Sequence, residues 1–165
     1  MILAIIISIL VFIFRDKFIH LQGLGLFGLF VLSIVGNATL ILPMPVVLTA
    51  FVGGGIYNPI LVAFVIALGA TIGELTGYLA GISAQEIIDE PKYKKVRGWM
   101  DKHGLWAIFV LAAIPNPAFD LAGIVAGATK IPVKKYFGVT FAGKLIKFIL
   151  IAFLGKIVTS YGFFI

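Results

Sequence analysis

Long apolar stretches, interrupted at a few polar or proline-containing points, make up most of this chain. Two of them, residues 60–82 and 136–158, are long enough as helices to cross a hydrocarbon core about 30 Å thick. The stretch 1–14 would cover only about 21 Å as a helix, so whether it spans fully stays open. This pattern predicts an all-α integral membrane protein with an N-terminal hydrophobic helix.

Two more apolar stretches, 23–57 and 104–128, each contain a Pro-x-Pro sequence. Proline removes a backbone donor and clashes with the preceding turn, and the residue before it avoids the helical region. Non-helical backbone in a membrane is tolerated only where it is buried in protein or lines a cavity. We therefore predict that each stretch forms a re-entrant hairpin of two half-length helices. The structural breaks fall at Pro43 and Pro45 in the first stretch and at Pro115 and Pro117 in the second.

The polar segment 83–103 lies between the two halves of the chain. Basic and apolar residues mix along it after Pro91, which is typical of an amphipathic helix on a membrane surface that begins at a proline. Together with 129–135 it holds eight of the thirteen Lys and Arg residues. The positive-inside rule therefore predicts that both segments are cytoplasmic in a multi-pass protein of the cell membrane.

The features of the first half recur in the same order in the second. The Pro-x-Pro sequence recurs 72 residues later, and Gly69 and Gly81 recur 74 residues later as Gly143 and Gly155. A hairpin returns to its own side and a spanning helix crosses once, so the second unit must be inverted. Inverted repeats with broken helices are typical of transporters, whose sites lie near the membrane midplane. The chain is then one membrane domain, 1–165, made of a hydrophobic and interfacial segment 1–22, repeat 1 at 23–82, the amphipathic segment 83–103 and repeat 2 at 104–158.

Glycines recur every fourth residue in the first spanning stretch, at Gly69, Gly73, Gly77 and Gly81. On a helix they form one row without side chains, against which another backbone can lie closely. The partner backbone belongs either to the same chain or to a second copy, so a homodimer stays open.

Four ionisable residues of the apolar stretches are expected to be buried: Glu74, Asp120, Lys144 and Lys147. A charge at such a depth is expensive and needs a partner, and these four charges sum to zero. We predict that Glu74 meets Lys147 or Lys144 across the repeat axis and that Asp120 meets the other lysine. Two alternatives remain, namely a static ion pair that only holds two helices together, and lysines that extend to the interface.

The composition narrows the function. Hydrophobic residues make up 61% of the chain and charged residues 12%, which is more apolar and less charged than a soluble domain. There are no cysteines, and the two histidines lie in separate polar stretches, so we expect no metal and no cofactor. No nucleophile–base pair or phosphate loop is visible, and we expect no enzyme. The net charge of +6 suits anionic lipid headgroups better than nucleic acid.

Two motifs resemble a known family. The sequence Gly69-Ala-x-x-Gly-Glu-x-x-Gly-Tyr-x-x-Gly81, and Ile114-Pro-Asn-Pro117 followed by Ala122-Gly-x-x-Ala-Gly-Ala128, are similar to the signatures of the DedA family, also called the VTT or SNARE-associated Golgi protein domain. The resemblance implies two facing re-entrant hairpins, a cytoplasmic-membrane location in prokaryotes, and lipid translocation. Prokaryotic members are linked to moving polyprenyl phosphates or phospholipids, often coupled to protons, and eukaryotic relatives resemble scramblases.

We therefore expect a lipid flippase or scramblase in which an anionic headgroup crosses along a polar track. A proton-coupled transporter of small ions or solutes is the first alternative, and a structural membrane protein with static buried ion pairs is the second. In the lipid transporter the two acids would gate the track or exchange protons, and the two lysines would attract phosphate. Further hydrogen bonds would come from Asn116, Asn37 and Thr71.

Overall fold

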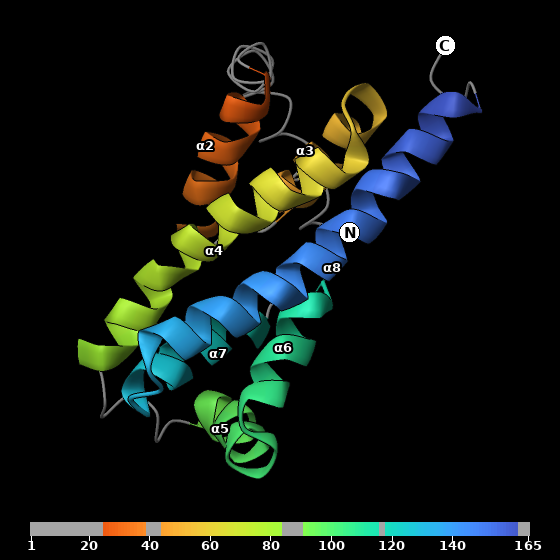
Figure 1. Cartoon of the computed structure of the whole chain (residues 1–165). Coiled ribbons are helices and arrows are strands. Elements are labelled where there is room, and N and C mark those ends of the chain that lie inside the picture. Colours follow the sequence, from red (N-terminus) through yellow and green to blue (C-terminus); the bar gives the residue numbers. More distant parts are fainter. Residues whose placement is uncertain (1–24, 39–43, 84–90, 116–117, 162–165) are drawn as a thin grey trace, which may run out of the picture.

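The computed structural model describes residues 25–38, 44–83, 91–115 and 118–161, and all regular structure within them is helical (Figure 1). The predicted N-terminal segment 1–22 lies outside these residues. In chain order the helices are α2 (Gly25–Ala38), α3 (Met44–Ile56), α4 (Pro59–Ser83), α5 (Pro91–His103), α6 (Leu105–Ala113), α7 (Ala118–Ala128) and α8 (Val133–Ser160).

Helices α4 and α8 are the two long elements and correspond to the two predicted spanning stretches. With 25 and 28 residues, both are apolar and long enough to cross a membrane. The start of α4 is fixed by Asn58, whose side-chain oxygen accepts hydrogen bonds from the backbone N–H groups of Ile60 at 3.0 Å and Leu61 at 3.4 Å. Pro59 occupies the first helical turn, where its missing N–H leaves no bond unmade.

Four short helices account for the two stretches that contain Pro-x-Pro. Helices α2 and α3 come from the first stretch, and α6 and α7 from the second, so the predicted interruption of both stretches is confirmed. Ile114, which precedes Pro115, has the extended backbone that a following proline favours, with φ −99° and ψ 135°. Pro45 lies in the first turn of α3, whereas Pro43 and Pro117 lie outside the described residues.

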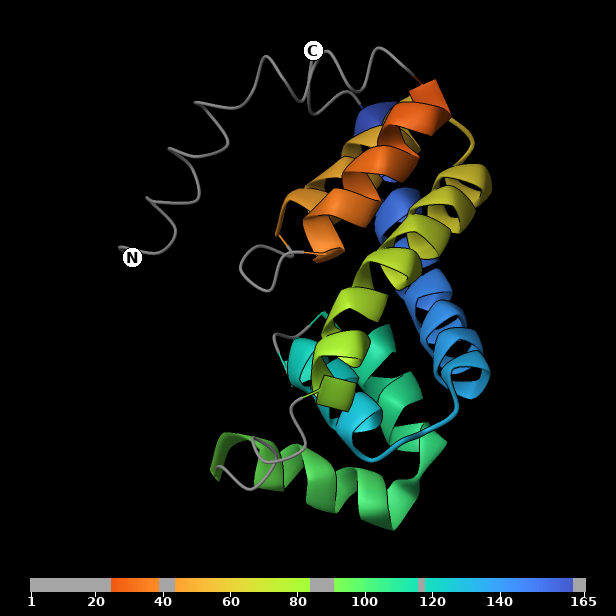
Figure 2. The same cartoon turned by 90° about the vertical axis from the view of Figure 1, so that its left-hand side faces the viewer.

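The two halves of the chain are interlocked. The first short helix of each half packs on the long helix of its own half, α2 on α4 and α6 on α8. The second short helix packs on the long helix of the other half, so α3 lies on α8 and α7 on α4. Helices α4 and α8 also pack against each other and cross in the middle of the molecule (Figure 2). Neither half can therefore bury its apolar surface without the other.

Buried glycines set the closest of these contacts. A Cβ atom at Gly69 or Gly73 would run into the backbone of α2, and one at Gly81 would run into Ile124 of α7. The predicted glycine row is therefore buried against two partners within the same chain, with Gly77 also buried. In the second half, a Cβ at Gly155 would meet the backbone of Phe51 in α3. Backbones that approach this closely leave no room for a side chain between them.

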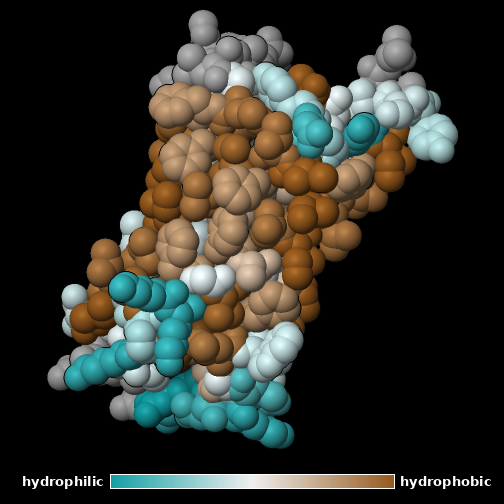
Figure 3. Space-filling view, in the orientation of Figure 1, coloured by the Kyte–Doolittle hydropathy of each residue, from teal (hydrophilic) through white to brown (hydrophobic). Residues whose placement is uncertain are grey.

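The outer surface shows a broad apolar band with hydrophilic residues at both ends, and more of them at the lower end, which is called the polar end below (Figure 3). Large apolar side chains such as Phe27, Leu61 and Leu150 are more than half exposed on several helices. An apolar surface this wide is unusual for a soluble monomer and fits contact with lipid. At the polar end lies α5, which begins at Pro91 as predicted. It buries Val96 and Met100, while Lys94, Lys95 and Lys102 are exposed.

The glycine contacts give the first prediction. Gly81→Ala should destabilise the protein by about 1–3 kcal/mol, because the added methyl group would push α4 and α7 apart. The control is Gly98→Ala on α5, where a Cβ would meet nothing within 4 Å. That change should stabilise by up to about 1 kcal/mol through helix propensity alone. The measurement is the unfolding free energy in detergent micelles, and equal effects at the two glycines would contradict the packing role of Gly81.

Candidate functional site

A buried ion pair joins the two long helices near their middles. The Nζ atom of Lys144 in α8 lies 2.8 Å from Oε1 of Glu74 in α4. The side chains are only 1% and 6% exposed. The predicted pairing of Glu74 with a lysine is therefore confirmed, with Lys144 as the partner. The alternative in which Lys144 extends to the interface is wrong, because its ammonium is enclosed between helices.

The ammonium of Lys144 has an acceptor for each of its three N–H groups. Besides Glu74, it donates to Oδ1 of Asn37 at 2.8 Å and to the backbone oxygen of Ala70 at 3.4 Å. Asn37 in turn donates from Nδ2 to the backbone oxygen of Ser33 at 2.9 Å, which fixes its amide orientation. A buried lysine whose donors are all used is tolerated far better than a bare charge.

Glycines next to both charged residues bring the short helices into reach. A Cβ at Gly73 would clash with the backbone of Ile34 and Asn37, so this glycine lets the end of α2 approach and delivers Asn37 to Lys144. On α8, a Cβ at Gly143 would lie 2.6 Å from the backbone oxygen of Phe109 in α6. The residues that precede the acid and the lysine are thus both glycines that admit a neighbouring helix.

Two helix ends face the pair. Asn37 lies in the last turn of α2, where unpaired carbonyl groups give the helix end a partial negative charge that favours the ammonium. Phe119 lies in the first turn of α7, and its ring centroid is 5.2 Å from Nζ of Lys144, within range of a cation–π contact. Neither Phe119 nor the carbonyl of Ala70 is evident from the sequence pattern.

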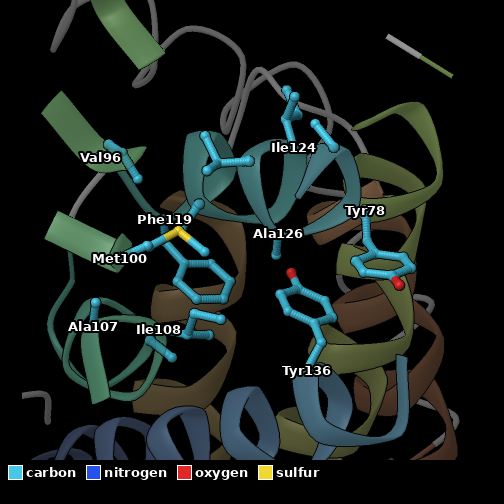
Figure 4. Packing of buried hydrophobic residues seen from close by; sticks show 13 residues of the cluster. Tyr78, Val96, Met100, Ala107, Ile108, Phe119, Ile124, Ala126 and Tyr136 are labelled. Atoms are coloured by element: carbon cyan, nitrogen blue, oxygen red, sulfur yellow. The ribbon is translucent and has the colours of Figure 1, made fainter. Parts of the chain in front are cut away.

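Further buried polar groups extend along α8 away from the pair. Tyr136, Thr140 and Lys144 are spaced four apart, on one face, and each is 1% exposed or less. The ring of Tyr136 stacks on that of Tyr78 at a centroid distance of 5.0 Å (Figure 4), and the Tyr78 hydroxyl donates to the backbone oxygen of Ile131 at 2.6 Å. The Oγ1 atom of Thr140 has no hydrogen-bond partner within the described residues. The spacing of four was the signal that could have identified this row.

Of the remaining predicted site residues, two have described side chains. Lys147 is half-buried, with Nζ 5.0 Å from the ring centroid of Phe148, and the hydroxyl of Thr71 donates to Ala67 of its own helix at 2.7 Å. Asp120 belongs to α7, but its side chain is not described, and Asn116 lies outside the described residues, so the predicted partner of Asp120 stays a prediction. Within the described part of the chain, no group of three His, Asp or Glu side chains could hold a metal.

A model of the VTT domain matches residues 42–157, which include α4, α8 up to its last turn, and the ion pair. The chain belongs to the VTT-domain family. This confirms the resemblance noted from the two glycine-rich motifs and identifies a membrane protein of the VTT/DedA superfamily with transmembrane helices.

Similar proteins include eukaryotic vacuole membrane proteins. Vacuole membrane protein 1 of Bos taurus is 37% identical over 90 residues, which are 50% of this chain and 22% of that protein. The Homo sapiens protein of the same name is 42% identical over 64 residues, or 39% of this chain and 16% of that protein. A homologue in Dictyostelium discoideum is 45% identical over 53 residues, or 32% of this chain and 13% of that protein. This VTT-domain chain therefore covers less than a quarter of these relatives, and no solved structure matches it.

The ion pair gives the second prediction. Glu74→Gln and Lys144→Met should each destabilise the protein by about 3–5 kcal/mol, because each leaves a buried charge without its partner. The double variant should be less destabilised than the sum of the two, and the difference measures their coupling in micelle unfolding experiments. Lys156→Met, at an exposed lysine of the same helix, serves as the control, and additive effects of the two main substitutions would show that the pair contributes no coupling.

Proposed function

We propose that this VTT-domain protein moves lipids between the two leaflets of its membrane, as a flippase or scramblase. The observation that carries the proposal is the Glu74–Lys144 pair, because a hydrogen-bonded ion pair near the middle of two spanning helices is a polar position in the apolar interior. Ionisable residues inside a membrane protein commonly mark the path of a substrate or a proton. The substrate we propose is a phospholipid or polyprenyl phosphate, whose anionic headgroup would exchange with Glu74 as the partner of Lys144.

The surroundings of the pair support this role. The ends of α2 and α7 lie beside it, and the segments 39–43 and 116–117 connect these short helices to their partners. Broken helices whose ends meet at the midplane are a recurrent way of building substrate sites in transporters. Asn37, already bound to Lys144, would supply a hydrogen bond to a headgroup oxygen, and Asp120 and Asn116 are proposed to complete the track.

The arrangement of the helices supports an inverted repeat, which we propose as the basis of the fold. In this repeat, α2 would correspond to α6, α3 to α7 and α4 to α8. The reason is that α2 packs on α4 as α6 packs on α8, and α3 packs on α8 as α7 packs on α4. In this scheme the pairs α2–α3 and α6–α7 are re-entrant hairpins, and α4 and α8 cross in opposite directions. The basic segments 83–103 and 129–135 would then share the cytoplasmic side of the cell membrane.

Two other functions remain as alternatives. A proton-coupled transporter of small ions or solutes would use the same buried charges. A structural membrane protein would keep the pair static, and replacing both residues by apolar ones would leave its stability and lipid flux unchanged. We propose no enzymatic activity and no nucleic-acid partner, and we regard a homodimer as compatible with each of these functions.

The third prediction tests lipid movement directly. Purified protein in liposomes should accelerate translocation of a fluorescent phospholipid or a polyprenyl phosphate, measured by the fraction accessible to an external quencher over time. Glu74→Gln and Lys144→Met should each reduce this rate at least tenfold while reconstitution stays equal. Lys156→Met should retain most of the rate, because Lys156 is an exposed lysine near the end of α8, away from the pair.

The outcomes separate the alternatives. Translocation that survives in folded Glu74→Gln and Lys144→Met variants would leave lipid movement standing and make the pair structural. If the wild-type protein moves no lipid, with or without a proton gradient, the proposal fails. Ion or solute flux in the same vesicles would then favour the second function.

The fourth prediction concerns topology. The chain has no cysteines, so a single introduced cysteine can be labelled without background. Lys94→Cys and Lys134→Cys should react with a membrane-impermeant thiol reagent from the cytoplasmic side, and Asn58→Cys and Ser160→Cys from the opposite side. All four positions are exposed. Figure 1 shows α5 and the start of α8 at one end of the molecule, and the start of α4 and the end of α8 at the other. Labelling of Lys94→Cys and Lys134→Cys from different sides would exclude the inverted arrangement.

A further inference from the structure

An apolar groove of about 280 Å³ lies on the outer face between α6 and α8. It is lined only by apolar side chains and one glycine: Leu105, Trp106, Phe109, Gly138, Val139 and Ala142. Gly138 and Ala142 lie about 200° around α8 from Thr140 and Lys144, so the groove is on the far side of this helix from the ion pair. It is a separate site from the one proposed for lipid movement.

The groove has an open floor and an aromatic wall. A Cβ at Gly138 would meet nothing within 4 Å, so the absence of a side chain there leaves the space empty. Trp106 is 69% exposed and stands edge-on to Phe109, with ring centroids 5.2 Å apart. An exposed tryptophan beside an apolar slot is typical of the boundary between headgroups and acyl chains.

Positive charge lies at one end of the groove. Lys134 and Lys135 are exposed in the first turn of α8, four residues before Gly138 and Val139, so they lie on the same face one turn closer to the polar end. Helical side chains lean toward the N-terminus, which directs both ammonium groups away from the apolar slot and toward the headgroup layer. The hydrophilic residues gather at this end of the molecule, beside the apolar band (Figure 3).

We propose that this groove binds one anionic phospholipid, with an acyl chain between α6 and α8 and the phosphate at Lys134 and Lys135. The apolar groove would hold an acyl chain, and the two lysines one helical turn away would hold the phosphate, which is the order in which these groups follow one another in such a lipid. A second protein copy would need a complementary acidic surface at the same level. Among the residues described at this end, Asp101 is the only acid, and its carboxylate lies 3.9 Å from Nε of Arg97 in its own helix. The proposal does not require that the protein moves lipid.

Trp106 provides the probe for a test. The chain has two tryptophans, so Trp99→Phe leaves Trp106 as the only one. The protein is reconstituted into phosphatidylcholine vesicles that contain a small fraction of brominated phosphatidylglycerol, or the same fraction of brominated phosphatidylcholine. Bromine quenches tryptophan fluorescence on contact. We expect the anionic lipid to be enriched at Trp106 roughly tenfold over the zwitterionic one, from two lysines near the membrane surface.

Two variants and two controls test the halves of the site. Lys134→Gln combined with Lys135→Gln should remove the preference, whereas Lys94→Gln combined with Lys95→Gln, the same charge change on α5, should keep it. Gly138→Leu should fill the groove and reduce quenching by both lipids, whereas Gly98→Leu should not. All six positions are exposed, and neither glycine has an atom within 4 Å of its added Cβ, so the fold should be kept.

The proposal is overturned by equal quenching from the two lipids in the Trp99→Phe protein. It is also overturned if the preference survives loss of both lysines, or if quenching falls as the protein concentration in the membrane rises, which would mean that a second copy covers the groove. If the wild-type protein moves no lipid but the quenching preference is observed, the proposed transport function is rejected and this lipid site stands.

Discussion

The Glu74–Lys144 pair is the constraint on which the arrangement of this VTT-domain protein depends. Either charge alone in the interior of a membrane protein would be strongly unfavourable, so the two long helices must cross where these side chains meet. That requirement fixes the rotation of α4 and α8 about their axes, because turning either helix would separate the charges. Asn37 and the carbonyl of Ala70 then satisfy the remaining donors of the ammonium, which ties α2 into the same position.

Close packing of helix backbones holds the remaining helices in place around the pair. The hydrophobic effect cannot drive helices together where lipid is as apolar as the helix surface, so contact depends on fit. Glycines on both long helices provide that fit, and they do so next to the charged residues as well as at the helix ends. Because each long helix receives one short helix from each half, the two halves stabilise each other and the pair at their centre stays enclosed.

The sequence predicted the elements better than their contacts. Length and proline positions located α4, α8 and the two interruptions, and the scarcity of buried charge was enough to expect that Glu74 meets a lysine. The prediction left open whether the partner is Lys144 or Lys147, although only Lys144 continues the row of Tyr136 and Thr140 at a spacing of four along α8. Asn37 was expected to form a hydrogen bond with a substrate, whereas its side chain accepts one from Lys144. These residues are 107 positions apart, and no local sequence pattern indicates such a contact.

The neutrality of the buried pair has an electrical consequence. A conformational change that carries Glu74 and Lys144 through the membrane together moves no net charge, so the transmembrane voltage neither favours nor opposes it. A change that separates them moves charge through the field, at about 2.3 kcal/mol for one elementary charge crossing 100 mV. Separation of the pair would therefore add a voltage dependence of its own to the one that comes from any charged lipid moving through the field.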